Sequence, residues 1–313
     1  MQLDELTQRE ALFALLRMRP KGRTWSDIAD EVGATRDAVG LLADVTLSDV
    51  LIPDPGVREV LAQVRREIAV WERTDDFSLV TVLDDDYPER LRAIRETPPF
   101  LFFRGRMAVS DRGMSVVGSR VASEAGLERS RVAADLLVQR GLAVISGLAA
   151  GIDATAHRAA LDAGGRTVAF VGTGIQNYYP AANARLQDEV AERGLVASQF
   201  LPESPPTRHA FPMRNATMSG YGLATIIVEA GEHSGTRIQA RVAVAHGRPV
   251  IVSEGVARNT LWGAALKSRP GVFVVSSTTE LADAIDEVVQ RESQLRDAVA
   301  GALGVRTLDL VAS

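Results

Sequence analysis

Short apolar runs alternate with helix-like stretches along most of the chain beyond residue 113. The runs are rich in β-branched residues, and each is only a few residues long. They lie at residues 114–117, 142–145, 167–171, 195–198, 224–228, 249–252 and 272–275. Buried runs of this kind, separated by helices, are typical of a parallel sheet that helices cover on both faces. The pattern therefore predicts an α/β fold with a doubly wound, mostly parallel sheet.

The intervening stretches predict the helices of this fold. They fall at about 123–140, 152–163, 183–193 and 235–246, and a last long helix begins near residue 278. Ser123 is placed to cap the first of them. A proline-bearing loop is expected after residue 200, including the basic stretch 208–215. In doubly wound folds ligands bind at the carboxyl ends of the strands, near the switch in strand order.

The first 74 residues have a helical pattern and predict a small, separate domain, either SAM-like or helix-turn-helix-like. The stretch 25–42 has the packing residues and the turn glycine of a helix-turn-helix. Its second helix, however, offers Arg36 as its only cation, beside Asp37 and Asp44. Because phosphate contacts dominate DNA affinity, this composition favours a structural role over sequence recognition.

Charge is distributed unevenly between the segments. Residues 1–100 carry 20 acidic and 13 basic side chains, residues 101–275 carry 13 and 19, and residues 276–313 carry 7 and 3. A basic middle segment suits a phosphate-bearing ligand, although drift in composition would give the same counts. Nearly all of the cations are arginines, with Lys21 and Lys267 the exceptions.

The sequence lacks the motifs of metal sites, nucleotide-cofactor sites and serine hydrolases. There is no cysteine, and no His/carboxylate cluster with metal-ligand spacing, so we expect no metal site. The Walker and nucleophile-elbow motifs are absent, and Gly172-Thr173-Gly174 lacks the third glycine of a dinucleotide fingerprint. We therefore expect neither a cofactor nor an enzyme. The polar N-terminus and the lack of an apolar run of roughly 18 residues favour a cytoplasmic protein with no membrane partner.

The stretch 144–161, VISGLAAGIDATAHRAAL, contains a tight strand-to-helix turn. Its glycines allow a sharp turn and a close approach of the backbone to its neighbours. Asp153 can cap the following helix, and His157 lies one turn later on the same face. A catalytic pair would need a nucleophile or a substrate, and none is evident. We therefore assign an architectural role to Ser146, Gly147, Gly151, Asp153 and His157.

Several linked motifs occur together in one order. They are the 84–105 stretch DDDYPERLRAIRETPPFLFFRG, Val117-Gly118-Ser119-Arg120, the 146–161 stretch SGLAAGIDATAHRAAL, Tyr179-Pro180, the 208–215 stretch RHAFPMRN and the 226–235 stretch IIVEAGEHSG. Together they resemble the DNA-processing protein A family, also called Smf. The resemblance implies an extended Rossmann-like domain over residues 75–290 that binds single-stranded DNA, protects it and loads RecA during natural transformation. It also implies a homodimer.

The resemblance places strand-contacting positions on Arg120, Arg208 and Phe211. Single strands are held by basic grooves with aromatic faces for stacking, and a helix start binds phosphate readily. We therefore predict a DNA-binding set from three loops. It comprises Gly118, Ser119, Arg120, Arg208, Phe211, Arg214, Asn215, Ser234, Gly235 and Arg237.

The chain departs from the family pattern at Ala216, where an arginine is usual, and at Ser253-Glu254, where Pro-Gly is expected. An acidic helical tail at 291–313 is expected in place of a winged-helix domain. These departures leave RecA loading open.

Two other classes also stay open. A sensor of a nucleotide-derived small ligand would use a closed pocket built from 118–120, 172–174 and 234–236. A phosphoribohydrolase-like enzyme is disfavoured, because Gln239 stands where a catalytic glutamate is needed.

Overall fold

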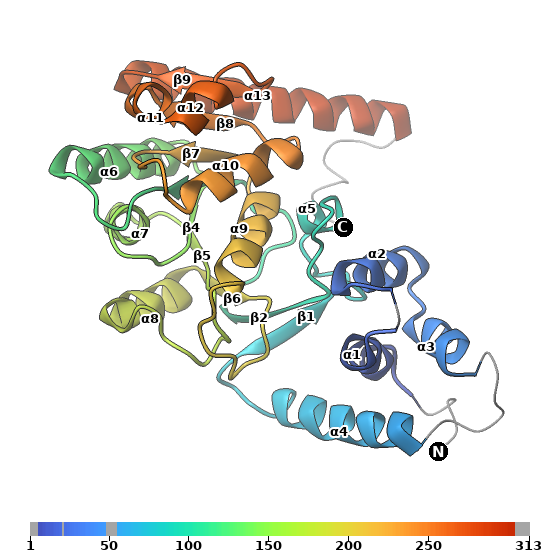
Figure 1. The fold of residues 1–313 in the computed structure, drawn as a ribbon. Coiled ribbons are helices and arrows are strands. Elements are labelled where there is room, and N and C mark those ends of the chain that lie inside the picture. Colours follow the sequence, from blue (N-terminus) through green and yellow to red (C-terminus); the bar gives the residue numbers. More distant parts are fainter. Residues whose placement is uncertain (1–5, 21, 48–54, 304–313) are drawn as a thin grey trace.

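The computed structural model describes residues 6–20, 22–47 and 55–303. Within them one sheet runs through the molecule in the order β1-β2-β6-β5-β4-β3-β7-β8-β9 (Figure 1). The seven neighbouring strands β6-β5-β4-β3-β7-β8-β9 pair in parallel. Strands β1 and β2 add an antiparallel edge beside β6. The strands are β1 (Ser78–Thr81), β2 (Phe100–Gly105), β3 (Gly113–Val117), β4 (Ala143–Ser146), β5 (Thr167–Phe170), β6 (Leu195–Ser198), β7 (Ala224–Ile227), β8 (Val250–Ser253) and β9 (Val272–Val275).

The predicted doubly wound sheet is confirmed, and its order defines a switch point. From β3 the chain winds outward through β4, β5 and β6, and it then returns to the other side of β3 with β7, β8 and β9. The carboxyl ends of β3 and β7 therefore diverge into helices on opposite sides, which opens a crevice between them.

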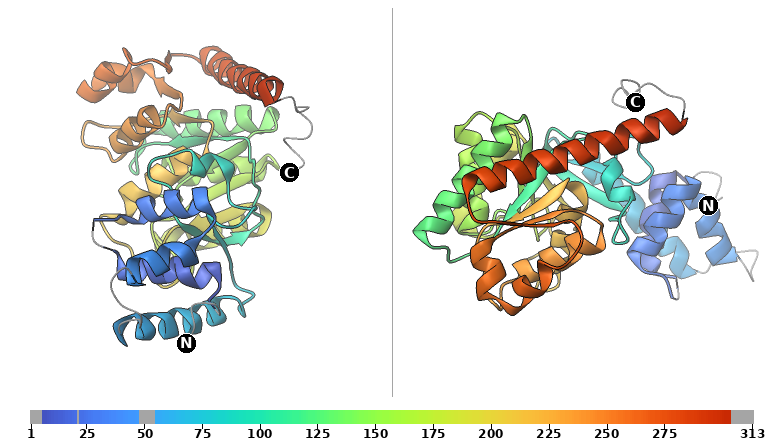
Figure 2. Two further views of the ribbon diagram at one scale, coloured as in Figure 1. Left: turned by 90° about the vertical axis from the view of Figure 1, so that its right-hand side faces the viewer. Right: turned by 90° about the horizontal axis from the view of Figure 1, so that it is seen from above.

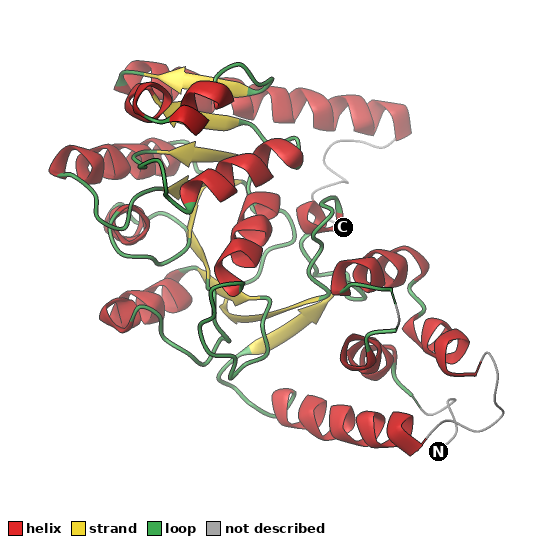
Figure 3. Cartoon of the chain, in the orientation of Figure 1, coloured by secondary structure: helices red, strands yellow, loops and turns green. Residues whose placement is uncertain are grey.

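Helices cover both faces of the sheet (Figures 1 and 3). Along β7 the side chains alternate: Ile226 packs with α6 and α13, whereas Ile227 packs on the side of α9 and α10. One face carries α6 (Glu124–Gln139), α7 (Ile152–Asp162), α8 (Ala184–Arg193) and α13 (Thr278–Leu303). The other carries α9 (Ala210–Tyr221) and α10 (Thr236–Ala245), while α5 (Glu89–Arg92), α11 (Glu254–Asn259) and α12 (Leu261–Leu266) are short.

Two element boundaries differ from the sequence predictions. The stretch expected as a basic loop at 208–215 is helical from Ala210 onward. Pro212 does not prevent this, because the first turn of a helix needs no intrahelical N–H donors. The boundary predicted at residue 290 falls inside α13, which runs without a break to Leu303. No helix in the described part of the chain is both long and apolar enough to cross a bilayer.

The N-terminal helices are α1 (Gln8–Met18), α2 (Trp25–Thr35), α3 (Ala38–Leu47) and α4 (Pro55–Trp71). They form the small helical unit that the sequence predicts, but the core of this unit is not separate from that of the sheet. The ring of Phe13 stacks on Phe100 of β2 at 5.0 Å between centroids, and Trp71 meets Phe102 edge-on at the same distance. The unit thus lies against the antiparallel edge of the sheet (Figure 2).

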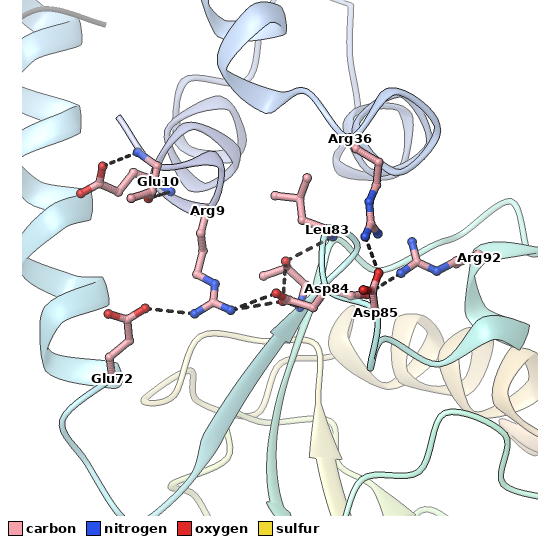
Figure 4. A network of polar contacts seen from close by, with 10 residues as sticks. Arg9, Glu10, Arg36, Glu72, Leu83, Asp84, Asp85 and Arg92 are labelled. Atoms are coloured by element: carbon pink, nitrogen blue, oxygen red, sulfur yellow. Dashed lines mark hydrogen bonds and ion pairs between the residues drawn. The ribbon is translucent and has the colours of Figure 1, made fainter. Parts of the chain in front are cut away.

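Ion pairs also join the N-terminal helices to the turn after β1 (Figure 4). Arg9 joins Glu72, the residue after α4, at 3.0 Å, to Asp84 in the turn after β1, at 3.1 Å. Arg36 pairs with Asp85 of the same turn. The cation that a DNA-recognition helix would have presented is therefore bound within the protein, in agreement with a structural role.

Candidate functional site

A cleft of about 730 Å³ opens at the switch point. It lies at the carboxyl ends of the strands, between the loops that follow β3 and β7, with the start of α9 beside them. Its lining includes most of the predicted DNA-binding set. The predicted residues that line it are Gly118, Ser119, Arg120, Asp153, Phe211, Arg214, Asn215, Ser234 and Gly235.

The loop between β3 and α6 forms one wall. The Ser119 amide donates to the carbonyl of Glu229, at 2.7 Å, which joins this loop to the one after β7. At Gly118 a Cβ atom would come within 2.7 Å of that same carbonyl oxygen, so only glycine fits here. Ser123 caps α6 as predicted, because its hydroxyl accepts from the Gly126 amide at 3.0 Å. The loop is thus held at both ends, and Arg120 is exposed between them.

An aromatic and cationic group forms the rim of the cleft. The Arg120 guanidinium carbon lies 5.3 Å from the ring centroid of Phe211, within the range of a cation–π contact. Tyr179, which is 40% exposed, packs against the same ring at 5.4 Å between centroids. A Cβ atom on Gly172 would come within 2.7 Å of Phe211 Cδ1. This glycine, in the loop after β5, therefore makes room for the ring.

Sequence reasoning missed two of these residues as parts of the site. Tyr179 was noted within a family motif but given no role, and Gly172 was weighed as part of a dinucleotide fingerprint and of the small-ligand pocket, but not as a residue of the DNA-binding site. Their position in the chain could have identified them. Both lie in the loop after β5, and the carboxyl end of β5 is on the same edge of the sheet as the carboxyl ends of β3 and β4. Neighbouring strands of a parallel sheet bring such loops together.

Arg214 lies in α9 and is buried, with 5% of its surface exposed. Its Nη1 donates to the carbonyls of Gly147, at 2.6 Å, and Phe170, at 2.7 Å. Its Nε donates to Oδ1 of Asn215 at 3.0 Å. Burial lowers the pKa of this guanidinium, and the nearby Asp153 carboxylate opposes the shift. Arg214 thus ties α9 to the ends of β4 and β5, although the sequence had placed it among exposed loop cations.

Gly147 is required by this arrangement. A Cβ atom there would lie 1.8 Å from Nη1 of Arg214, which is far inside contact distance. Gly151 has a φ of +76°, a conformation that favours glycine, and its Cα faces the Ser119 carbonyl. The two glycines therefore pack the β4–α7 loop between Arg214 on one side and the β3–α6 loop on the other.

The capping role predicted for Asp153 is wrong. The N-cap residue of α7 is Gly151, and Asp153 lies within the first turn, with Oδ2 accepting from the Gly147 amide at 3.2 Å. The sequence could not distinguish these roles, because an acid in the first turn and an acid at the cap differ by only two positions. Burial raises the pKa of the Asp153 carboxyl, against the attraction of Arg214.

His157 and Ser146 are structural side chains beneath the cleft. The Thr167 hydroxyl donates to the Val144 carbonyl, so it accepts from Nδ1 of His157 at 2.7 Å. Complete burial, with the charge of Arg214 nearby, lowers the His157 pKa from 6.5 to about 3. Ser146 donates to the Val116 carbonyl at 2.6 Å. The imidazole is therefore neutral and bound to Thr167 rather than paired with Asp153.

The loop after β7 and the start of α10 form the opposite wall. The Thr236 amide donates to the Ser234 hydroxyl at 3.2 Å, which orders the turn at Ser234-Gly235. Gln239 lies on the floor of the cleft with 1% of its surface exposed. Glu232 also lines the cleft, and one of its carboxylate oxygens accepts from the Leu261 amide at 2.7 Å.

Arg208 and Arg237 are exposed beside the cleft rather than within its lining. Together with Arg120 they share one property: none of the three forms an ion pair with any residue that the structure describes. Exposed arginines elsewhere do pair, for example Arg131 with Glu128 at 2.9 Å. Exposed guanidinium groups that form no ion pair attract anions.

The structure also bears on the expected small-ligand pocket and on metal binding. The pocket expected for a small-ligand sensor includes Gly172–Gly174, but this segment is not among the lining residues of the cleft, and the Phe211 ring packs against Gly172. In the described residues, no group of three or more His, Cys, Asp or Glu side chains is placed to hold a metal ion.

Together the sheet and the cleft define a doubly wound α/β protein with a cleft at its topological switch point. A family model for DNA recombination-mediator protein A matches residues 78–286. The chain belongs to this family.

Relatives of this family are similar over large parts of the chain. The DNA processing protein DprA of Streptococcus pneumoniae is 38% identical over 180 residues, which cover 57% of this chain and 64% of the relative. The protein Smf of Escherichia coli is 35% identical over 187 residues, covering 59% and 50%. A putative DNA processing protein DprA of Mycobacterium tuberculosis is 35% identical over 269 residues, covering 75% and 68%. The matched region thus spans between half and two thirds of most of these relatives.

Solved structures agree in fold. DNA processing protein A from Streptococcus pneumoniae superposes with a TM-score of 0.63 at 30% identity, covering 89% of this chain and 94% of that one. DNA processing protein A from Helicobacter pylori, whose structure concerns its single-stranded DNA binding mode, has a TM-score of 0.60 at 20% identity, covering 67% and 97%.

Proposed function

We propose that this protein binds single-stranded DNA without sequence preference, at the switch-point cleft. The observation that supports this most is the combination on its rim: exposed arginines without ion pairs beside the aromatic rings of Phe211 and Tyr179. Basic grooves with stacking rings are the usual means of holding single strands. Both kinds of contact tolerate any sequence, since every nucleotide has a phosphate and a base with a π face.

The residues divide into those that contact the strand and those that position the contacts. Arg120 and Arg208 bind phosphates, and Phe211 offers its face to a base. Arg214 and Asp153 act indirectly: they fix the β4–α7 loop from both sides, so the rim is ordered before the strand arrives. Preorganisation of this kind reduces the entropy lost on binding.

We further propose that the site binds without catalysis. His157 is buried and neutral, and Gln239 offers an amide where a proton-accepting carboxylate would be needed. By its family we expect the protein to act in the cytoplasm as a homodimer, to protect incoming strands and to assist RecA loading in natural transformation.

Equilibrium binding of an oligo-dT strand and of a matched duplex, across a salt series, tests the proposal. Wild-type protein should prefer the single strand, and its affinity should fall as salt rises. Arg120→Ala should weaken binding strongly, whereas Arg131→Ala, which removes an exposed arginine that is already paired, should leave it unchanged.

Two results would contradict the proposal. Equal affinity for strand and duplex would remove the single-strand assignment. Displacement of the strand by a mononucleotide at comparable affinity would favour the small-ligand sensor, for which a cleft of this volume is also large enough.

A further inference from the structure

The segment 232–271 carries an excess of unpaired positive charge outside the switch-point cleft. It has only two carboxylates, Glu232 and Glu254. None of its cations forms an ion pair with any residue in the described ranges. Those cations are Arg237, Arg241, Arg248, Arg258, Lys267 and Arg269, and all but the half-buried Arg248 are exposed.

Helix α10 arranges part of this charge in a line. Arg237, Arg241 and Ala245 are its exposed positions, four residues apart, so they lie on one face of the helix. The first turn of α10 lines the switch-point cleft, and its ten residues span about 15 Å. The helix therefore leads from the cleft at the carboxyl edge of the sheet toward the opposite, amino edge (Figure 1).

A second cleft, of about 540 Å³, lies where α10 ends. We call it the amino-edge cleft. It is lined by Val244 and Gly247 at the end of α10, by four arginines and by one carboxylate, that of Glu292. The arginines are Arg90, Arg248, Arg269 and Arg291.

The positive charge of the amino-edge cleft is not neutralised from within. The Glu292 carboxylate is already shared by Arg90, at 2.9 Å, and by Arg112, at 3.1 Å. Arg291 pairs with Glu287 on its own helix. Arg248 Nε is buried with no hydrogen-bond partner in the described structure, and its Nη2 reaches carbonyl oxygens only at 3.3 and 3.4 Å.

We propose that Arg237, Arg241, Arg248 and Arg269 form a basic track that carries the phosphates of a single strand from the switch-point cleft along α10 to the amino-edge cleft. The inference rests on the proposed function and extends it. Continuity with the cleft favours a nucleic-acid strand over an acidic protein as the occupant. Guanidinium groups also match phosphate geometry in a bidentate manner. The cleft alone thus holds a short strand, and the track extends the site for a longer one.

A length series of oligo-dT strands, each measured across salt, tests the track with the double variant Arg241→Ala/Arg269→Ala. Both side chains are exposed and unpaired, so the fold should persist, which a thermal melt checks. For the longest strand the slope of log Kobs against log salt should become shallower by about 1.4, or about 0.7 for each lost phosphate contact on a single strand. For the shortest strand that binds, the affinity and the slope should match wild type.

The matched control is Arg131→Ala, which removes an exposed arginine of α6 on the other face of the sheet. It should change neither the affinity nor the salt slope for the short strand or the long strand. The track is wrong if the double variant binds long strands as wild type does, or if it loses equal affinity for short and long strands. If wild-type protein binds no strand of any length, the proposed function itself fails. The two failures are therefore distinguishable.

Discussion

Arginines at two regions of this molecule have opposite surroundings. At the contact between the N-terminal helices and the sheet, Arg9 and Arg36 meet carboxylates of the turn after β1, and Arg92 donates to the Val82 and Asp84 carbonyls in the same turn (Figure 4). At the switch-point cleft Arg120, and beside it Arg208, form no ion pair with any residue that the structure describes. The comparison indicates that arginines paired with carboxylates belong to a structural contact, whereas unpaired arginines mark the surface at which we propose that a strand binds.

The two regions also use aromatic rings differently. At the domain contact Phe100 and Phe102 are fully buried among other rings. At the cleft Phe211 is half-buried, and Tyr179 beside it is exposed. The first set stabilises the fold through burial, whereas the second has ring surface left for a ligand.

The largest effect should come from the aromatic contact. Phe100→Ala should lower the free energy of unfolding by about 3–5 kcal/mol, because it removes a completely buried ring from the shared core. Urea unfolding measures the loss. Phe211→Ala, at a half-buried ring, should cost much less stability. A comparable loss in the two variants would mean that both rings serve the core.

The support beneath the cleft should be sensitive to acid. The His157 pKa is about 3 in the folded protein and 6.5 in the unfolded chain. Between these values the unfolded chain binds one more proton, so stability falls as pH falls, by up to about 1.4 kcal/mol per pH unit.

His157→Asn should flatten this dependence in urea midpoints measured between those two values. The comparison with wild type isolates the imidazole, since Asp153, with its raised pKa, acts with the opposite sign in both proteins. His233→Asn, at an exposed histidine, should keep the wild-type slope. An unchanged slope in His157→Asn would show that the imidazole is not held neutral.

Removal of the rim ring should affect strand binding. Phe211→Ala should weaken single-strand affinity by about 1–3 kcal/mol, the range for a lost base stack. Gly172→Ala should weaken it less but measurably, because its new methyl would displace the Phe211 ring. Fluorescence anisotropy measures both. Wild-type affinity in Gly172→Ala would mean that the position of the ring does not matter.

The smallest effect should come from the paired cations. Arg36→Ala should change the free energy of unfolding by less than about 1 kcal/mol, because its ion pair with Asp85 is largely exposed. Single-strand affinity should not change at all. A loss of affinity in this variant would return the N-terminal helices to consideration as a DNA-binding unit.

Much of the fold was predictable because the parallel strands are buried on both faces and therefore read as unbroken apolar runs. The antiparallel edge was not predicted, since the run at Phe100–Gly105 carries no signal for strand direction. The sequence also did not predict that the N-terminal helices and the sheet share one hydrophobic core. A helical pattern in the first 74 residues cannot show that Phe13 and Trp71 meet rings of the sheet.

The site was predictable to the level of its loops. Glycines at strand ends located the cleft, but residue type could not show which arginine is buried. Arg120 and Arg214 look alike in the sequence, yet one is exposed and the other donates into the core. That difference follows from α9, which begins two residues before Pro212 and places Arg214 on its buried side just after the first turn.

Hydrogen–deuterium exchange of wild-type protein, with and without an oligo-dT strand, tests the central distinction most directly. The strand should protect backbone amides at 118–121, 211–215 and 231–241, around the unpaired arginines. Exchange in β1, in β2 and in the N-terminal helices should stay unchanged. Protection confined to those helices, with none at the cleft loops, would contradict the account.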